Sequence, residues 1–217
     1  MTPIQAQSLP AILKGRDLLA QAKTGSGKTA AFAIGILHKL AVKTYRTQAL
    51  VLCPTRELAD QVSKELRLLA RAMPNTNILT LCGGKPMGPQ LASLERNPHI
   101  VVGTPGRVLK HLGKRTLKLD GLTMLVLDEA DRMLDMGFHD DIMRIIEMTP
   151  RQRQTLLFSA TYPDEIKEIS HAIQIDPVDV RVESLHDNKQ IEQIFYEIQK
   201  GERTRTLVAL LQHYRPE

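Results

Sequence analysis

The sequence predicts an α/β fold in which a doubly wound parallel sheet carries helices on both faces. Seven short runs rich in Val, Ile and Leu recur along residues 1–182, and helix-length amphipathic segments separate them. Runs that are apolar on both faces are typical of a parallel sheet covered on both sides. Of the 217 residues, 42% are hydrophobic and 24% are charged, which suffices for one large domain with a sizeable core.

The expected strands, in chain order, are the apolar runs 17–22, 48–53, 77–82, 99–104, 123–128, 155–160 and 178–182. Between the second and third runs, apolar residues recur at helical spacing at Leu58, Val62, Leu66 and Leu69. We therefore expect a surface helix with one buried stripe there. Ligands of such folds bind at the carboxyl ends of the strands, so the residues directly after each run are the candidates for function.

The pattern changes near residue 182. Residues 183–190 are polar and are expected to form a linker, followed by a strand at 191–198 and a helix at 202–214. One strand and one helix cannot bury a core unaided. This segment therefore either completes the first domain or begins a second domain that the chain does not contain.

Charge and composition narrow the classes of partner. The net charge is +5 and the pI about 9.3, which permits a polyanionic partner but also fits an ordinary basic surface. Cys53 and Cys82 lie in apolar runs and are expected to be reduced and buried, and the histidines lack zinc-site spacing. No apolar stretch is long enough to span a membrane, so we expect a cytoplasmic protein without a membrane partner.

A glycine-rich turn follows the first expected strand and comprises Ala22, Lys23, Thr24, Gly25, Ser26, Gly27, Lys28 and Thr29. Gly25 and Gly27 allow a tight turn whose N–H groups face a phosphate. Lys28 can then reach the outer phosphates, and the Thr29 hydroxyl is placed to hold Mg²⁺. Ala22 departs from the generic phosphate-loop pattern. A simple turn between strand and helix is the alternative, but the Lys-Thr pair in register with the following helix favours a phosphate site.

Three carboxylates, Asp128, Glu129 and Asp131, follow the fifth run within four positions. Carboxylates this close repel one another and resist ionising when desolvated. A Mg²⁺ ion at the phosphate loop would favour an ionised Asp128, directly or through water. Glu129 could then orient and deprotonate a water that attacks a γ-phosphate, while Asp131 accepts a hydrogen bond from a neighbour. A charged surface turn, the alternative, leaves this placement after a buried strand unexplained.

These motifs resemble those of the DEAD-box ATP-dependent RNA helicases. The matching segments are AKTGSGKT (22–29), DEAD (128–131), SAT (159–161), TPIQ (2–5), PTRELA (54–59), GG (83–84) and TPGR (104–107). The resemblance covers residues 1 to about 182 and implies a RecA-like P-loop NTPase domain that uses ATP and Mg²⁺. In that family alanine occupies the position of Ala22. The stretches QALVLCPTRELADQV and NILTLCGG are most similar to the bacterial DbpA type.

The resemblance also implies roles that spacing alone does not give. Gln5 would read the adenine edge and favour ATP over GTP. Ser159 and Thr161 would hydrogen-bond the Asp131 region and couple the ATP state to RNA binding and domain closure. Taken by themselves, TPIQ is a turn entering a helix, and the other two are polar residues that end a strand.

The candidate RNA contacts follow other strands on the same rim and are Pro54, Thr55, Arg56, Gly83, Gly84, Thr104, Pro105, Gly106 and Arg107. Helix N–H groups suit phosphate oxygens, and Arg56 and Arg107 add positive charge, although each alone reads equally well as a surface arginine. No aromatic residue is among them, and only 4% of the chain is aromatic. We therefore expect recognition of the sugar-phosphate backbone rather than of base sequence.

Members of this family complete the active site with a second RecA-like domain that carries a His-x-x-Gly-Arg-x-x-Arg motif, which this sequence lacks. Residues 191–217 look like the opening strand and helix of that domain. We expect the chain alone to bind ATP weakly and hydrolyse it negligibly, as half of an RNA-stimulated ATPase acting in ribosome assembly or RNA metabolism. The alternatives are an RNA-binding clamp without hydrolysis and a DNA-directed superfamily 2 helicase, which the DEAD and SAT motifs disfavour.

Overall fold

The computed structural model describes residues 1–23, 25–182, 194–199 and 201–215. The chain divides into two compact units, Met1–Ser184 and Leu185–Glu217. The linker predicted at 183–190 lies outside the described residues, and so does Thr24 of the glycine-rich turn. The domain boundary at residue 182 stays a prediction.

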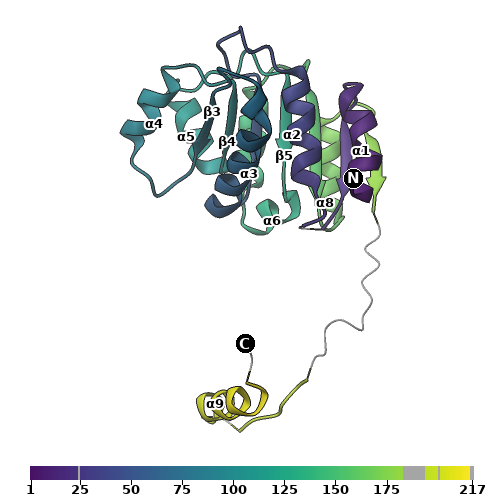
Figure 1. Cartoon of the computed structure of the whole chain (residues 1–217), viewed down its shortest axis with the longest axis vertical. Helices are drawn as coiled ribbons and strands as arrows, with labels where there is room; N and C mark the ends of the chain where they lie inside the picture. The colour runs from purple at the N-terminus through teal and green to yellow at the C-terminus, as the bar shows by residue number, and fades with distance from the viewer. Residues whose placement is uncertain (24, 183–193, 200, 216–217) are drawn as a thin grey trace. The chain divides into compact units, whose positions relative to one another are not determined.

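The first unit is built on a seven-stranded parallel sheet (Figure 1). Its strands are β1 (Leu18–Gln21), β2 (Ala49–Leu52), β3 (Ile78–Leu81), β4 (Ile100–Gly103), β5 (Met124–Leu127), β6 (Gln154–Ser159) and β7 (Val178–Arg181). Each lies within or overlaps one of the predicted apolar runs. The spatial order is β3-β4-β2-β5-β6-β1-β7, so β1 and β2 are separated by β5 and β6.

Helices cover both faces of this sheet. They are α1 (Pro3–Leu13), α2 (Lys28–Lys39), α3 (Arg56–Leu69), α4 (Met87–Leu94), α5 (Pro105–Gly113), α6 (Ala130–Asp135), α7 (His139–Glu147) and α8 (Asp164–Ile173), with a 3₁₀ turn η1 (Ala70–Ala72). Alternate strand residues point to opposite faces. Val51 packs with the cluster that contains α1, α2 and α3, whereas Leu50 packs with the cluster of α5, α7 and α8. The predicted doubly wound α/β fold is confirmed.

The helix α3 corrects one detail of the predicted stripe. Val62 and Leu66 are buried as expected, but Leu69 is 41% exposed. The α-helix ends at Leu69, and the tighter η1 turn that follows buries Ala70 in its place. A periodicity argument assumes that the helix continues unchanged, and here it does not.

The described part of the second unit contains one helix, α9 (Arg203–Tyr214), close to the predicted 202–214. The strand predicted at 191–198 is wrong where it can be seen: residues 194–199 form no strand, and 191–193 lie outside the described residues. A strand requires a neighbour, and every strand pair in the described chain belongs to the first unit. No residue of α9 is buried, so the described residues of this unit form no core of their own.

Two further expectations concern cysteines and membranes. Cys53 and Cys82 are both buried and free, as predicted. Burial raises the pKa of both thiols, so neither is a ready nucleophile. Among the helices that the structure describes, none has the length and apolar character needed to cross a membrane.

Candidate functional site

The glycine-rich turn joins the end of β1 to the start of α2. Gly25 and Gly27 have φ angles of +81° and +91°, a region that favours glycine because other residues are strained there. A Cβ added at Gly25 would meet nothing within 4 Å, so the backbone there is open to a ligand. Gly27 caps α2, whose first residue is Lys28. The turn therefore presents a helix N-terminus and its N–H groups to one open space.

Lys28 and Asp128 meet at this edge although they are a hundred residues apart in the chain. The loops after β1 and β5 emerge at the same end of the parallel sheet, and Lys28 Nζ lies 3.0 Å from Asp128 Oδ1. The Lys28 side chain is 4% exposed and that of Asp128 fully buried. Glu129 Oε1 is 3.7 Å from the same Nζ, and Glu129 Oε2 is 3.5 Å from Arg132 Nη1. The structure thus brings the predicted phosphate loop and acidic motif into one buried cluster.

Polar atoms of this cluster are buried without hydrogen-bond partners among the described residues. They are Ser26 Oγ, Lys28 Nζ and both carboxylate oxygens of Asp128. Lys28 Nζ and Asp128 Oδ1 are close enough to form an ion pair. Burial raises the pKa of Asp128, and the nearby Lys28 ammonium only partly opposes that rise. Buried polar groups are usually satisfied, so this set indicates a polar ligand.

The same atoms fit a phosphate-bound magnesium ion. Lys28 can donate to phosphate oxygens, and Asp128 can bind a hard cation directly or through water. The described residues contain no group of three or more His, Cys, Asp or Glu side chains that could hold a metal by themselves. Magnesium characteristically takes few protein ligands together with substrate phosphates and waters. A single buried carboxylate beside a phosphate loop suits that mode.

Glu129 occupies an unusual backbone conformation. Its φ and ψ are 55° and 53°, the left-handed region, and it is the N-cap residue of α6. A non-glycine residue there costs roughly 1 kcal/mol or more. This turn lets the chain leave β5 abruptly while both Asp128 and Glu129 stay near Lys28. Strain of this kind is common at functional sites.

Asp131 and Thr161 join the acidic motif to the end of β6. The backbone N–H and the hydroxyl of Thr161 both donate to Asp131 Oδ2 at 2.9 Å, and the Arg132 N–H donates to Oδ1 at 3.0 Å. Burial tends to raise the pKa of Asp131, but these hydrogen bonds outweigh it and the pKa is lowered. Ser159 Oγ is buried, and its hydroxyl adds to the lowering of the Asp131 pKa. Thr161, with two hydrogen bonds to Asp131, makes the main link.

Gln5 lies against the phosphate loop. Its Nε2 donates to the Gly27 carbonyl at 3.1 Å, and its Oε1 accepts from the Thr2 N–H at 3.0 Å. The second bond is part of a capping box at the start of α1. A Cβ on Gly27 would come 2.6 Å from Gln5 Nε2, so a glycine is needed for this approach. TPIQ thus ties α1 to the loop.

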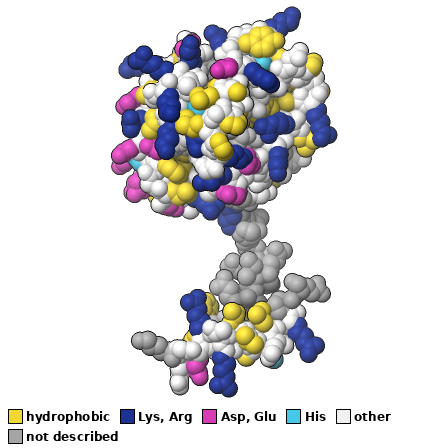
Figure 2. Space-filling model, turned by 90° about the vertical axis from the view of Figure 1, so that its left-hand side faces the viewer, with side chains coloured by type: hydrophobic (Ala, Val, Ile, Leu, Met, Phe, Trp, Pro, Cys, Tyr) yellow, Lys and Arg dark blue, Asp and Glu magenta, His cyan; other side chains and the backbone are white. Residues whose placement is uncertain are grey.

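A hollow of about 490 Å³ lies along the same edge beyond β2 and β4. It is lined by Pro54, Thr55, Arg56, Glu57, Gly83, Gly84, Thr104, Gly106, Arg107, Lys110, Met136 and Phe138. We call it the groove. All predicted RNA contacts except Pro105 line it. Pro105 is buried as the first residue of α5. The space-filling view of the β3 side shows Lys and Arg side chains spread among acidic and hydrophobic ones (Figure 2).

Sequence reasoning missed several groove residues. Lys110 could have been found, because it lies three positions after Arg107 on α5 and so shares its face. Met136 and Phe138 come from the turn between α6 and α7 and carry no local signal. Phe138 packs on the hydrophobic core, so its ring supports the groove wall.

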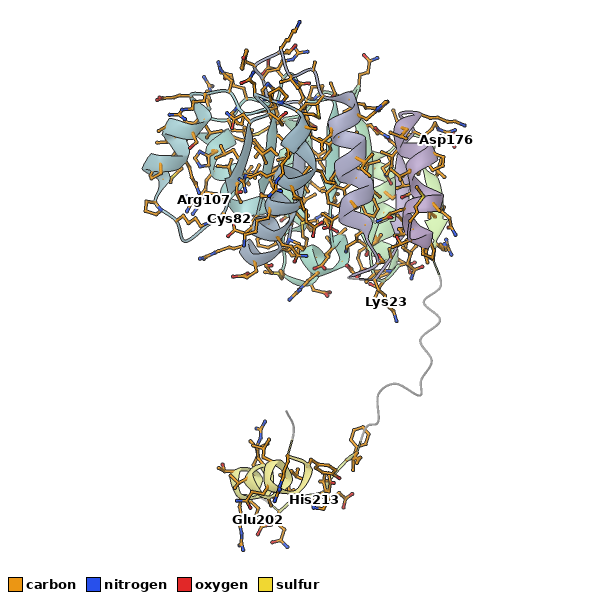
Figure 3. The ribbon with its side chains drawn as sticks, in the orientation of Figure 1. Lys23, Cys82, Arg107, Asp176, Glu202 and His213 are labelled. Carbon is orange, nitrogen blue, oxygen red and sulfur yellow. The ribbon has the colours of Figure 1, made fainter. Side chains whose placement is uncertain are left out.

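Arg107 is held in place by a residue that the motifs do not contain. Its Nη1 donates to Gln90 Oε1 at 2.9 Å, and its Nη2 donates to the Lys85 carbonyl at 3.1 Å. Gln90 is buried; its Nε2 donates to the Cys82 carbonyl at 3.1 Å, and its Oε1 lies 3.0 Å from His111 Nε2. Because this oxygen can only accept, His111 Nε2 must carry a proton. Figure 3 shows Arg107 and Cys82 close together on the β3 side.

Arg56 owes its position to the glycine pair. Gly84 has a φ of +73°, and a Cβ added there would lie 1.8 Å from Arg56 Nη1. The guanidinium therefore packs directly over the Gly84 backbone. Thr55 begins α3 by accepting the Leu58 N–H at 3.2 Å, which fixes the first turn that carries Arg56.

Comparison with known proteins identifies this arrangement. A family profile for the DEAD/DEAH box helicases matches residues 2–169. The chain belongs to this helicase family. It is 57% identical to the ATP-dependent RNA helicase DbpA of Escherichia coli over 216 residues, covering 100% of this chain and 47% of DbpA. It is 44% identical to the DEAD-box ATP-dependent RNA helicase CshA of Bacillus subtilis, covering 100% of this chain and 44% of CshA.

Solved structures of this helicase family share the fold. A DEAD box protein from Methanococcus jannaschii superposes with a TM-score of 0.80 at 40% identity, covering 97% of this chain and 57% of that one. Saccharomyces cerevisiae Dbp5, solved with Nup159, Gle1, IP6 and ADP, superposes with a TM-score of 0.74 at 29% identity. The match covers 84% of this chain and 48% of that one. The predicted RecA-like fold and the resemblance to the DbpA type are confirmed. The chain spans about half the length of the curated relatives it matches.

Proposed function

We propose that this chain is the ATP- and RNA-binding half of an RNA-dependent ATPase that separates short RNA duplexes or remodels RNA–protein complexes. One observation carries the proposal: Lys28 and Asp128 form a buried pair at a phosphate-loop helix, with polar atoms that lack partners among the described residues. The ion pair compensates each buried charge only partly, because burial removes the water that would otherwise hydrogen-bond both groups. A nucleotide with its metal supplies both missing partners.

At the nucleotide end, different groups contact the phosphates, the metal ion, the adenine and the attacking water. Lys28 and the loop N–H groups hold the outer phosphates, Thr29 and Asp128 hold Mg²⁺, and Gln5 reads the adenine edge. Mg²⁺, when bound, neutralises phosphate charge and orients the oxygens for in-line attack. Glu129 accepts a proton from the attacking water, since it lies beside Asp128 at the same buried cluster.

Asp131 and Thr161 couple this end to the rest of the domain. The two donors of Thr161 hold the acidic motif against the end of β6, so a shift of Asp128 with nucleotide state moves the β6 loop as well. Ser159, with its buried hydroxyl, is the adjacent group available to form a new bond in another state. This coupling is the route by which ATP would alter RNA affinity.

The groove is the proposed RNA site. Arg56 and Arg107 supply charge, while Thr55 and Thr104 lie at the N-termini of α3 and α5, whose N–H groups suit phosphate oxygens. The aromatic lining residue, Phe138, packs into the core instead of standing free as a stacking platform. Backbone recognition without sequence preference follows.

Hydrolysis requires groups that lie outside this domain. In this proposal a second RecA-like domain supplies arginines to the γ-phosphate, and a finger arginine contributes roughly 10³–10⁵ in rate. The chain by itself then binds ATP–Mg²⁺ weakly and turns it over negligibly.

The test is nucleotide binding by this chain, measured as displacement of a fluorescent ATP analogue. Lys28→Ala should abolish binding, Asp128→Asn should remove its dependence on Mg²⁺, and the exposed Lys64→Ala on α3 should change neither. Unaltered affinity in Lys28→Ala would end the proposal. Anisotropy with matched single-stranded RNA and DNA separates the alternatives, since equal binding of both would favour a DNA-directed helicase.

A further inference from the structure

A separate basic cavity of about 540 Å³ lies at the opposite edge of the sheet from the phosphate loop. It is lined by Gly15, Lys39, Thr123, Arg151, Gln152, Arg153, Gln154 and Ile175. These residues lie at or just after the ends of helices, or at or just before the starts of strands, at the amino edge of the sheet. Figure 3 shows the separation: Asp176, the neighbour of Ile175, lies at the upper edge and Lys23, beside the phosphate loop, at the lower edge.

The charge of this cavity is unbalanced. Three of its lining side chains, Lys39, Arg151 and Arg153, are cations, and none is a carboxylate. None of the ion pairs found among the described residues involves these three cations. Asp17 is the acid that acts on Lys39 and Arg153, but its oxygens already accept backbone N–H groups. Positive charge therefore gathers here with only partial compensation.

Lys39 is held at the cavity wall by a fixed glutamine. Gln154 Nε2 donates to the carbonyls of Ile12 at 3.0 Å and Arg16 at 2.6 Å, so its Oε1 must face the other way. That oxygen accepts from Lys39 Nζ at 2.6 Å. A Cβ on Gly15 would lie 3.1 Å from the same Nζ, so the small residue leaves room for the ammonium. An ammonium has three donors, and this bond uses one.

Arg153 also lines the cavity with N–H groups that remain available to a ligand. Its Nη1 donates to the Pro150 carbonyl at 2.7 Å, while its Nε is buried and has no partner within the described part of the chain. Burial lowers the pKa of both Arg153 and Lys39, which Asp17 opposes in each case. Arg153 is partly buried and Lys39 is exposed, and cations with unused N–H groups are stabilised when an anion binds.

We propose that this cavity binds phosphate groups through Lys39, Arg151 and Arg153. A guanidinium fork beside an ammonium suits a tetrahedral oxyanion, and the volume admits more than one phosphate. Two sources share this chemistry: a free oligophosphate and the backbone of an RNA that extends beyond the groove. The site does not depend on the nucleotide pocket, because no residue is common to the two.

The test uses the Arg Nε–H signals of this chain in ¹H–¹⁵N NMR, titrated separately with pyrophosphate and with a single-stranded RNA hexamer. Arg153 Nε–H should shift with a saturable curve, and Lys39→Met should weaken that curve about tenfold or more, as loss of a charge-assisted hydrogen bond does. Lys64→Met, an exposed cation elsewhere, should leave it unchanged. Gly25 and Gly27 amide shifts report the nucleotide pocket in the same spectra.

The possible outcomes distinguish a free oligophosphate from an RNA backbone as the ligand. A response to pyrophosphate alone assigns a free-anion site, and a response to both ligands with mutual competition assigns an RNA backbone site. No shift of Arg153 Nε–H with either ligand overturns the proposal, as does equal weakening by Lys39→Met and Lys64→Met. The Arg153 Nε–H titration of the unmutated chain decides whether the cavity binds either ligand, so a poorly folded variant does not obscure that result. If Arg153 Nε–H does not shift but the Gly25 amide does, the cavity proposal is overturned and the proposed ATP site is not affected.

Discussion

The Lys28–Asp128 cluster and the groove, both at the carboxyl edge of the sheet, differ in how their charged groups are satisfied. At the phosphate loop, Lys28 and Asp128 are buried and keep polar atoms without partners among the described residues. In the groove, Arg107 is partly exposed and its guanidinium is already hydrogen-bonded to Gln90 and to a backbone carbonyl. The buried cluster keeps polar atoms available for a compact, highly charged ligand. The groove presents pre-oriented donors to a ligand that stays partly in water.

This difference predicts where mutations act. Removing a partner at the nucleotide end leaves a buried charge behind, so folding stability suffers most. Removing a group that positions a groove cation costs less stability and instead disorders the surface that binds. Four substitutions test this contrast, from the largest expected effect to the smallest.

Lys28→Met should lower the free energy of unfolding by about 3 kcal/mol at pH 8, because it leaves the buried Asp128 carboxylate uncompensated. The pKa of Asp128 is already raised by burial and would rise further. For a carboxyl with a raised pKa, stability is present at low pH and lost as pH rises through that pKa. The deficit should therefore shrink at pH 5. Urea titrations at both values measure it.

Lys64→Met, on the exposed face of α3, is the matched control and should change stability little at either pH. A deficit in Lys28→Met that is small, or the same at pH 5 and pH 8, would contradict the view that Asp128 is a desolvated charge held by Lys28.

Gln90→Leu should cost about 2 kcal/mol, because a buried amide that satisfies Arg107, His111 and the Cys82 carbonyl is lost. RNA affinity should fall as well, since Arg107 loses one of its two anchors. Gln61→Leu, an exposed α3 residue, is the control for stability. Thermal unfolding and RNA anisotropy measure the two effects. Unchanged RNA binding with lowered stability would make Gln90 a purely structural residue.

The sequence predicted local features far better than tertiary neighbours. Every strand of the sheet could be predicted because each is a continuous apolar run, buried on both faces in a parallel sheet. The glycine-rich turn could be predicted because its positive-φ glycines and the helix start at Lys28 are local features, whereas its contacts with Asp128 and Gln5 come from distant parts of the chain. Gln90 could not, because α4 meets Arg107 of α5 only through the packing of the β3 side. The same limit explains the missed Phe138.

The errors also have physical causes. The strand predicted at 191–198 had a suitable pattern, but residues 194–199 have no strand beside them in the described chain. Leu69 fitted a helical stripe that ends one residue before η1 begins. A pattern states what a segment can bury, and the neighbours decide whether it does.

Gly84→Ala tests how the glycine pair positions Arg56 in the groove. An alanine at φ +73° costs roughly 1 kcal/mol of backbone strain, and its Cβ would displace the Arg56 guanidinium. The side chain is flexible at that end, so the strain sets the loss of stability and the displaced arginine sets the loss of RNA affinity. Gly83→Ala, at the adjacent position, is the control. A Cβ added there would lie 3.9 Å from Arg56 Nη2, which is an ordinary contact. Equal effects of the two would refute this account.

Thr161→Val should have the smallest effect, under about 1 kcal/mol, because the Asp131 hydrogen bond it removes is partly exposed to water. The lowered pKa of Asp131 stabilises the fold above the ordinary carboxyl pKa, and this stabilisation is lost as pH falls through the lowered value. The difference between the parent chain and Thr161→Val should therefore begin to shrink below about pH 4 and vanish only below the lowered pKa of Asp131. Thr161→Ser keeps the hydroxyl donor and should follow the parent across the range. A difference that persists in acid would mean that the methyl group and its packing, rather than the charged hydrogen bond, link the acidic motif to β6.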